Sequence, residues 1–290
     1  MTDIRDRGHR LRFGLVTPQM WRSWDEILEL WSWAEDAGWD AAFLVDHFIS
    51  DWEGEMGANL EAFSTLAALA REVPRIELGV FVAGITHRPP MVLLKSAITL
   101  DHVSNGRFLL GVGAAWNERE HQEYGIPFPS PADRVGAVEE TLTALRLLES
   151  QQRTDFAGQY LRLDNATFEP KPVRGRLPVV VGSRRPRMLD ILSRFGDYWD
   201  AAGTIDDVAR TGEVLDASCR RNGRDPDDIV WMHEEVAKDA HATIEGLADR
   251  VNALSAVGVS FFLVNVWPRS DSSVIERLGN GLQRLREKTA

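Results

Sequence analysis

Short apolar runs alternate along this chain with longer segments in which apolar residues recur every three or four positions. Most of the runs are continuously apolar, which is typical of strands that are buried on both faces of a parallel sheet. The spacing in the intervening segments is typical of amphipathic helices that cover such a sheet. The strands are expected at residues 11–18, 40–46, 75–83, 106–113, 177–183, 197–201, 228–236 and 258–266.

The number of strand–helix units decides how the sheet closes. About eight units in 290 residues match a closed (β/α)8 barrel, whereas doubly wound sheets usually have about five or six strands. No stretch resembles a linker between two cores, so the expected organisation is a single domain over residues 1–290. The sequence therefore predicts an α/β fold of the TIM-barrel type.

One segment interrupts the alternation of strands and helices. Residues 151–176 contain TDFAGQYLRLD, which has the pattern of a β-hairpin, and most of the proline-spaced run FEPKPVRGRLP. We interpret this segment as an insertion between the fourth helix and the fifth strand of the barrel.

The first expected helix has the clearest local signals. Ser23 and Glu26 have the spacing of a capping box, and Gly38 marks the end of the helix. In later helices, Pro90 and Pro186 stand where the first turn tolerates proline. The apolar stripe of the first helix should cover the outside of the sheet and consists of Ile27, Leu30, Trp31 and Ala34.

The overall charge limits the expected partners. The 33 Lys and Arg residues against 44 Asp and Glu residues give a formal charge of −11, and such a field repels nucleic acids and anionic membrane surfaces. The single cysteine, Cys219, has no partner for an internal disulfide, and the first residues are charged where a secretory signal is apolar. No window approaches the roughly 18 apolar residues of a membrane helix. We therefore expect a cytoplasmic protein that acts on a small-molecule substrate.

Candidate chemistry lies at the C-terminal ends of the expected strands, where barrel enzymes place their active sites. Asp46 and His47 directly follow the second strand. A histidine there can donate a hydrogen bond or a proton to a bound ring, and the neighbouring carboxylate can fix its orientation or tautomer. The alternative is a turn in which Asp46 caps a backbone N–H and His47 is half exposed. The sequence supports both interpretations.

No metal site is expected. The histidines show none of the spacings of common metal motifs, such as HxxxH, HExxH or a nearby His–Cys pair. They are His9, His47, His87, His102, His121, His233 and His241.

The segment GVGAAW, residues 111–116, follows the fourth strand. It lacks the third glycine of a dinucleotide fingerprint because Trp116 stands there, and it lies in the fourth unit rather than the first, so a Rossmann site is not expected. Its two glycines could let a flat ligand approach the backbone, or they could serve only tight packing at a barrel corner.

The segment VVVGSRRPRML, residues 179–189, combines a strand, a Gly-Ser turn and a helix that opens at about Pro186. Free N–H groups and a helix N-terminus suit an anion, and Arg184, Arg185 and Arg187 stand close by in an otherwise acidic chain. We therefore expect the phosphate of a cofactor there. The alternative is a solvated helix cap with surface arginines.

Together these motifs resemble a known family. Residues 85–128, with VDHF after the second strand, FAGQYLRL in the inserted segment and VVVGS followed by FGDYW, resemble the bacterial luciferase-like superfamily. More narrowly, they resemble its group of oxidoreductases that use the deazaflavin coenzyme F420. The likeness runs from about residue 11 to residue 267. It implies a (β/α)8 barrel that holds a deazaflavin or flavin ring in its C-terminal mouth.

The resemblance also implies roles for individual residues. His47, with Asp46 beside it, would lie near the reactive face of the ring, and a non-prolyl cis peptide would lie near Val80–Phe81, behind the ring. Backbone N–H groups around Gly182 would hold the phosphate. The cofactor-binding residues implied in this way are Val80, Phe81, Ala83, Gly113, Ala114, Ala115, Trp116, Gly182, Ser183 and Arg184.

Three positions depart from the family pattern. Ser183 and Ala115 stand where relatives often have glycine, and Pro89 stands where histidine is frequent. The resemblance favours a coenzyme F420-dependent oxidoreductase that transfers a hydride between C5 of the deazaflavin and a small organic substrate. The alternatives are an FMN-dependent monooxygenase, which uses reduced flavin and oxygen, and a barrel that binds a ligand without turning it over. By analogy, a homodimer is the assembly to test.

Overall fold

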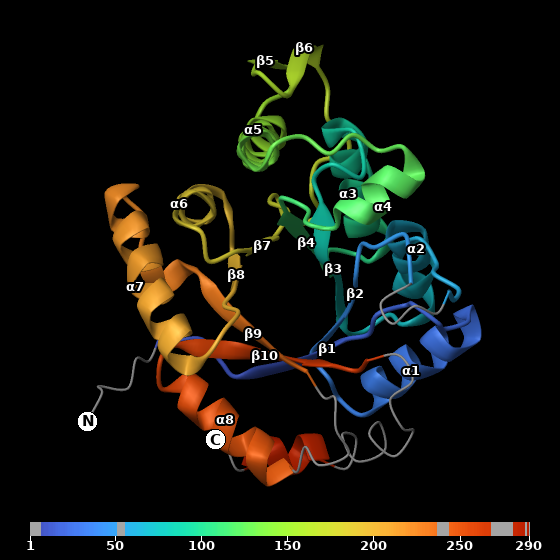
Figure 1. Ribbon diagram of the computed structural model, residues 1–290, viewed down its shortest axis with the longest axis vertical. Helices are drawn as coiled ribbons and strands as arrows, with labels where there is room; N and C mark the ends of the chain where they lie inside the picture. The colour runs from blue at the N-terminus through green and yellow to red at the C-terminus, as the bar shows by residue number, and fades with distance from the viewer. Residues whose placement is uncertain (1–6, 51–55, 237–243, 268–280, 288, 290) are drawn as a thin grey trace.

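Eight parallel strands form the closed barrel that the sequence predicts (Figure 1). The computed structural model describes residues 7–50, 56–236, 244–267, 281–287 and 289. Around the barrel the strand order is β1-β10-β9-β8-β7-β4-β3-β2, and every neighbouring pair is parallel. The strands are β1 (Arg12–Val16), β2 (Ala41–Leu44), β3 (Glu77–Gly84), β4 (Phe108–Gly113), β7 (Val179–Gly182), β8 (Tyr198–Asp200), β9 (Val230–Val236) and β10 (Val259–Asn265). Each lies within one of the eight predicted ranges or exceeds it by one residue.

Helices surround the barrel (Figure 1). The capping box of Ser23 and Glu26 is present, and the predicted apolar stripe of the first helix is buried. No helix in the described part of the chain has the length and apolarity that a membrane crossing requires. The helices are α1 (Trp24–Asp36), α2 (Ala62–Glu72), α3 (Pro90–Val103), α4 (Glu118–Tyr124), α5 (Pro131–Ser150), α6 (Pro186–Phe195), α7 (Ile205–Arg221), the short 3-10 helix η1 (Pro226–Asp228) and α8 (Ile244–Ser255).

The predicted hairpin is also present. Strands β5 (Thr154–Ala157) and β6 (Arg162–Ala166) pair antiparallel in a separate two-stranded sheet, which lies beside α5 and away from the barrel (Figure 1). The carboxylate of Glu140 on α5 accepts hydrogen bonds from the N–H groups of three successive turn residues, at 2.7 to 2.9 Å. This side chain therefore ties the hairpin turn to the helix that precedes it.

Apolar side chains fill the inside of the barrel below its C-terminal mouth. Alternate residues of each strand point inward, and Phe43, Phe81 and Phe261 pack against one another with ring centroids 5.8 and 6.3 Å apart. Truncating one of these rings would cost about 3–5 kcal/mol of stability. The inner cluster consists of Val16, Ala41, Phe43, Phe81, Leu109, Val180, Met232, Phe261 and Leu263.

Candidate active site

A cavity of about 380 Å³ opens at the C-terminal ends of the strands. It is bordered by the ends of β3, β4, β7, β8 and β9 and by the segments that follow β2, β3 and β4. The fold therefore brings together residues that are far apart in the chain. Of the residues expected at a site, those that line this cavity are Asp46, His47, Phe81, Ala83, Gly113, Ala114, Ala115, Trp116 and Gly182.

The remaining expected residues lie elsewhere. Val80 points away from the cavity into the core between barrel and helices, where it is fully buried. Ser183 and Arg184 lie on the turn after β7 and do not border the cavity. A non-prolyl cis peptide is present, one bond later than expected, between Phe81 and Val82. The pairing of β3 with β4 is irregular at this point, between Val80 and Ala83.

The carboxylate that hydrogen-bonds His47 is Glu120, not Asp46. Glu120 Oε1 lies 2.9 Å from Nδ1 of His47, and Oε2 accepts the backbone N–H of Phe48 at 2.9 Å. Asp46 cannot take this place because successive residues of an extended segment point to opposite sides. Trp116 packs edge-on against the His47 ring, at 5.5 Å between centroids. The structure therefore corrects the expectation that Asp46 orients this histidine.

Glu120 is a buried anion in this arrangement, because only 1% of its side chain is exposed. Burial alone would raise the pKa of Glu120, but the hydrogen bonds from His47 and Phe48 and the nearby His87 hold it below its usual value. An ionised Glu120 accepts a hydrogen bond from Nδ1–H of His47 and so selects that tautomer.

Asp46 forms a separate ion pair with Arg88. Its two carboxylate oxygens accept hydrogen bonds from the two terminal nitrogens of Arg88, at 2.8 and 2.9 Å, while Oδ2 also accepts the N–H of Gly84 at 3.1 Å and lies 3.1 Å from Nδ1 of His87. Burial alone would raise the pKa of Asp46, but His87 and Arg88 lower it to about 2. Asp46 is therefore a carboxylate at any ordinary pH.

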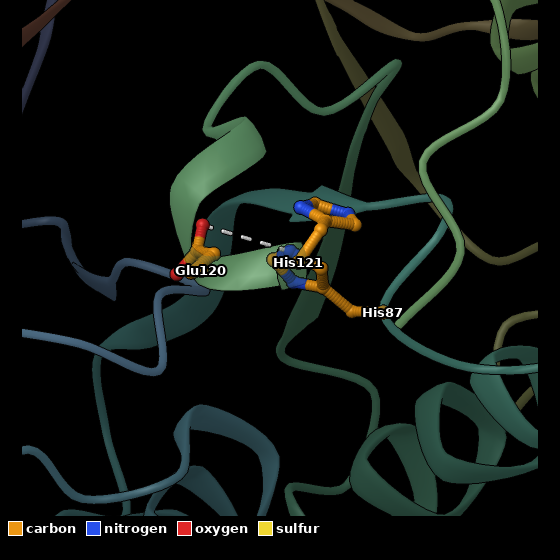
Figure 2. A group of neighbouring side chains, drawn as sticks. All are labelled: His87, Glu120 and His121. Carbon is orange, nitrogen blue, oxygen red and sulfur yellow. Dashed lines mark ion pairs between the residues drawn. The ribbon is translucent and has the colours of Figure 1, made fainter. Parts of the chain in front are cut away.

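His87 links the two carboxylates. Its Nδ1 faces Asp46, and its Nε2 lies 3.7 Å from Oε1 of Glu120, the contact drawn in Figure 2. The His87 ring follows β3, whereas Glu120 and His121 come from α4 (Figure 2). The network therefore runs from His47 at the cavity wall to the buried ion pair of Asp46 and Arg88.

The same cluster contains the one group of possible metal ligands within the described ranges, namely His87, Glu120 and His121, whose ligand atoms lie within 4.8 Å of one another. Both ring nitrogens of His121 are already hydrogen-bonded, to Oγ1 of Thr86 at 2.6 Å and to the carbonyl oxygen of Asn117 at 2.7 Å. Burial lowers the pKa of His121, which favours the neutral ring. We interpret the cluster as a hydrogen-bond network, and the expectation of no metal stays a prediction.

Small residues form the wall after β4. Gly113, Ala114 and Ala115 expose no side chain beyond Cβ, so a flat ligand can lie close to the backbone. Ala115 has φ of 56°, in the left-handed region that favours glycine. At Gly111 the packing alternative holds, because an added Cβ would lie 2.1 Å from the carbonyl oxygen of Val80.

A second group of carboxyls lines the opposite wall. Burial and then the like charge of Glu234 raise the pKa of Asp200 to about 7. Burial also raises the pKa of Glu234, although Asn265 donates a hydrogen bond to its Oε1 at 2.5 Å. One carboxyl of this pair can therefore hold a proton near neutral pH.

The arginine-rich turn after β7 lies between two hollows. Gly182 borders the main cavity, whereas Arg184 and Arg185 border a hollow of about 440 Å³ between α6 and α7. Ser183 orders the turn, because its carbonyl oxygen accepts from Nε1 of Trp199 and its Oγ from the N–H of Arg185, each at 3.0 Å. The phosphate-binding role of this turn stays a prediction.

Sequence reasoning missed Glu120, His87 and Asp200. Glu120 stands in the charged run NEREH, and nothing in such a run tells a buried carboxylate from a solvated one. His87 lacks a recognisable spacing partner because its contacts, Asp46 and Glu120, are distant in the chain. Asp200 is the last residue of β8, so its position at a strand end was the available signal.

A closed eight-stranded parallel barrel with a polar cavity at its C-terminal mouth defines the chain as a TIM-barrel protein with a candidate active site. The sequence model of the luciferase-like monooxygenase family matches residues 9–241 of this chain. The chain belongs to this family.

Individual relatives include both deazaflavin enzymes and monooxygenases. The chain is 31% identical to an F420-dependent glucose-6-phosphate dehydrogenase of Intrasporangium calvum, over 69% of this chain and 61% of that protein. It is 30% identical to the pyrimidine monooxygenase RutA of Allorhizobium ampelinum, over 58% and 47%. An F420-dependent secondary alcohol dehydrogenase, solved with an F420-acetone adduct, has the same fold, with a TM-score of 0.84 and 18% identity over 96% of this chain and 100% of that one.

Proposed function

We propose that this chain is a coenzyme F420-dependent oxidoreductase that transfers a hydride between the deazaflavin and a small organic substrate. The observation that carries the proposal is the cavity at the barrel mouth, in which a wall of small residues stands next to a histidine held by a buried carboxylate. Two of the relatives named above use F420, which favours the deazaflavin over FMN.

The residues present fit a flat tricyclic ring. Gly113 and Ala114 leave a flat surface, and the bulge at Phe81 and Val82 would support the ring from behind. A bound deazaflavin would supply the hydride; the chain would bind the ring, orient it and exclude water. Gly182, Ser183 and Arg184 would hold the phosphate through backbone N–H groups and the guanidinium.

His47 is the proposed catalytic residue. It borders the cavity, and its Nδ1 is held by the anionic Glu120, so its ring has one orientation toward a ligand. With Nδ1–H donated to Glu120, the neutral ring would accept a hydrogen bond from a substrate hydroxyl at Nε2, and the protonated ring would donate a proton from Nε2 to a substrate oxygen as the hydride moves. Asp46 would act indirectly, by holding Arg88 and His87 in place.

A parallel titration with coenzyme F420 and FMN tests the proposal. We expect F420 to bind in the micromolar range or tighter, with a shifted absorbance spectrum and a raised melting temperature, and FMN to bind more weakly. No response to F420 would contradict the proposal, and a response to reduced FMN with oxygen consumption would favour a monooxygenase. Oxidation of reduced F420 by a panel of acceptors separates an enzyme from a barrel that only binds ligand.

The assembly is a separate proposal. By analogy with the family we propose a homodimer, and light scattering after gel filtration gives its mass directly. A mass of one chain, 32.5 kDa, would contradict it.

A further inference from the structure

The cavity wall opposite His47 is made by the ends of β8 and β9, whose last inward side chains in the cavity are Asp200 and Glu234. Asn265, at the corresponding position of β10, does not border the cavity. On β8, Tyr198 packs against the apolar interior and the next inward position is Asp200. On β9, Met232 lies in the apolar interior and the next inward position is Glu234. On β10 the corresponding step leads from Leu263, inside the barrel, to Asn265. Three neighbouring strands therefore end in a layer of carboxyl and amide groups above an apolar floor.

This layer has more acceptors than donors. Asn265 is only 7% exposed, and its Nδ2 donates to Glu234. Its Oδ1 and the Oδ1 of Asp200 are buried, and neither has a hydrogen-bond partner among the described residues. A buried acceptor without a donor destabilises the fold. Of these two side chains only Asp200 borders the cavity, so Asp200 is the one that favours a ligand with an N–H or O–H donor.

The described residues also place no neutralising cation in this layer. Neither Asp200 nor Glu234 forms an ion pair within the part of the chain that the structure describes, and the terminal nitrogen of Arg184 lies 3.7 Å from Asp207 instead. The charged and titratable groups that act on Asp200 are Glu234, His233 and Arg184. Two carboxyls in one cavity resist ionising together, so the pair retains a proton. A bound cation would take the place of that proton, and the wall therefore favours a cationic ligand.

We propose that Asp200 and Glu234, the latter held by Asn265, form a subsite for a protonated amine of the substrate. An ammonium group has up to three donors and one positive charge, which matches the acceptor oxygens of two neighbouring carboxyls that together retain negative charge. A carboxylate or phosphate at the same place would face two acidic side chains. Gly182 contributes space, because a Cβ there would lie 3.1 Å from Oδ2 of Asp200. Only the assignment of the amine to a substrate rests on the proposed function.

The test compares three probes of one shape and different charge: benzylamine, benzyl alcohol and benzoate. Their binding to the full chain is measured by NMR titration at pH 8, with and without saturating coenzyme F420. The informative variant is the double substitution Asp200→Asn/Glu234→Gln. The matched control, Asp164→Asn/Glu213→Gln, removes the same charge from exposed positions on β6 and α7.

Benzylamine should bind the unmodified protein at least about tenfold more tightly than benzyl alcohol, with benzoate weakest, because hydrogen bonds to charged groups are the stronger ones. The double variant should lose this preference and the control should keep it. Equal binding of benzoate and benzylamine, or a preference that survives in the double variant, would overturn the proposal.

The coenzyme arms separate this proposal from the proposed function. A preference for benzylamine without any response to F420 would support the amine subsite and contradict the proposed deazaflavin-dependent activity. Displacement of benzylamine by F420 would show that this wall belongs to the coenzyme, and would overturn its assignment to the substrate.

Discussion

Two aspartates face the same cavity from opposite walls, and their acidities differ widely. Asp46 follows β2 and has a pKa of about 2, whereas Asp200 ends β8 and has a pKa of about 7. Burial by itself would raise the pKa of both carboxyls. Asp46 is compensated by Arg88 and His87, while Asp200 faces the like charge of Glu234. The partners that the fold supplies therefore decide the charge of a buried carboxyl.

The difference separates two roles. A carboxylate that accepts hydrogen bonds from Arg88, His87 and a backbone N–H has no capacity left for a ligand, so Asp46 organises the wall. Asp200 has a buried oxygen without a partner among the described residues, so it can respond to what enters the cavity. One wall is preorganised, and the other is open to exchange of a proton or a ligand.

The largest effect is expected from breaking the compensated side with Arg88→Ala. Loss of the guanidinium would leave Asp46 buried without its main cation, and its pKa should rise toward that of Asp200. We expect a loss of about 3–5 kcal/mol in the free energy of unfolding, measured by denaturant titration. Arg75→Ala, which removes an ion pair of a 63% exposed side chain, should cost at most about 1 kcal/mol. Equal losses for the two variants would contradict this account.

The uncompensated side is tested by Asp200→Asn. The pKa of Asp200 rises from 3.8 in the unfolded chain to about 7 in the folded protein, so the folded protein binds this proton more tightly. The carboxyl therefore does not destabilise the fold below pH 3.8, and it destabilises the fold progressively as the pH rises from 3.8 to 7. The amide removes this cost. The variant should therefore gain stability relative to the unmodified protein at pH 8 by about 2–4 kcal/mol, and hardly at all near pH 4.

Asp46 has the opposite sign. Its pKa falls from 3.8 to about 2 on folding, so its stabilising contribution is present above pH 3.8 and disappears as the pH falls toward 2.

Denaturant titrations of the Asp200→Asn and unmodified proteins at pH 4, 6 and 8 check the prediction for Asp200. A gain that does not change with pH would mean that the Asp200 carboxyl is not shifted.

A smaller effect is expected from Glu120→Gln, which removes the charge that holds His47. The amide can still fill the space but cannot fix one tautomer of the histidine, so kcat should fall by about 10–100-fold while the affinity for F420 changes little. Turnover of reduced F420 and a binding titration measure the two quantities. Glu118→Gln, on the exposed first turn of the same helix, is the control. A loss confined to coenzyme affinity would place Glu120 in binding rather than in orienting His47.

The smallest effect should come from Glu234→Gln, which removes the like charge but leaves Asp200 buried. The pKa of Asp200 should fall by about one unit and stay above 3.8, because burial is the larger cause. Carbon-13 NMR of labelled aspartate carboxyls follows this titration directly. A pKa that returns fully to the ordinary value would make Glu234, rather than burial, the main cause.

The barrel was predictable because its signals are local. Continuous apolar runs specify strands that are buried on both faces, and a capping box or a proline in the first turn marks where a helix begins. The positions of Asp46 and His47 at the barrel mouth followed from the same pattern, since the residues after a parallel strand lie at one edge of the sheet. The cavity lining after β4 was likewise expected, because Gly113, Ala114 and Ala115 precede Trp116 in GVGAAW.

The partners within the site were not predictable in this way. Glu120 reaches His47 across 73 positions of the chain, and Arg88 reaches Asp46 across 42. A sequence pattern of short period carries no information on such contacts. It also suggested the wrong carboxylate for His47, because neighbours in sequence point to opposite sides of an extended segment.

By itself, then, the sequence determined the strands, the helices, the closed barrel and the rim on which the candidate chemistry lies, since each depends on periodicity and local capping. Only the tertiary structure decided which carboxyl is an anion and which retains a proton. The physical reason is that acidity inside a protein depends on burial and on charges a few ångströms away, and folding chooses those neighbours from distant parts of the chain.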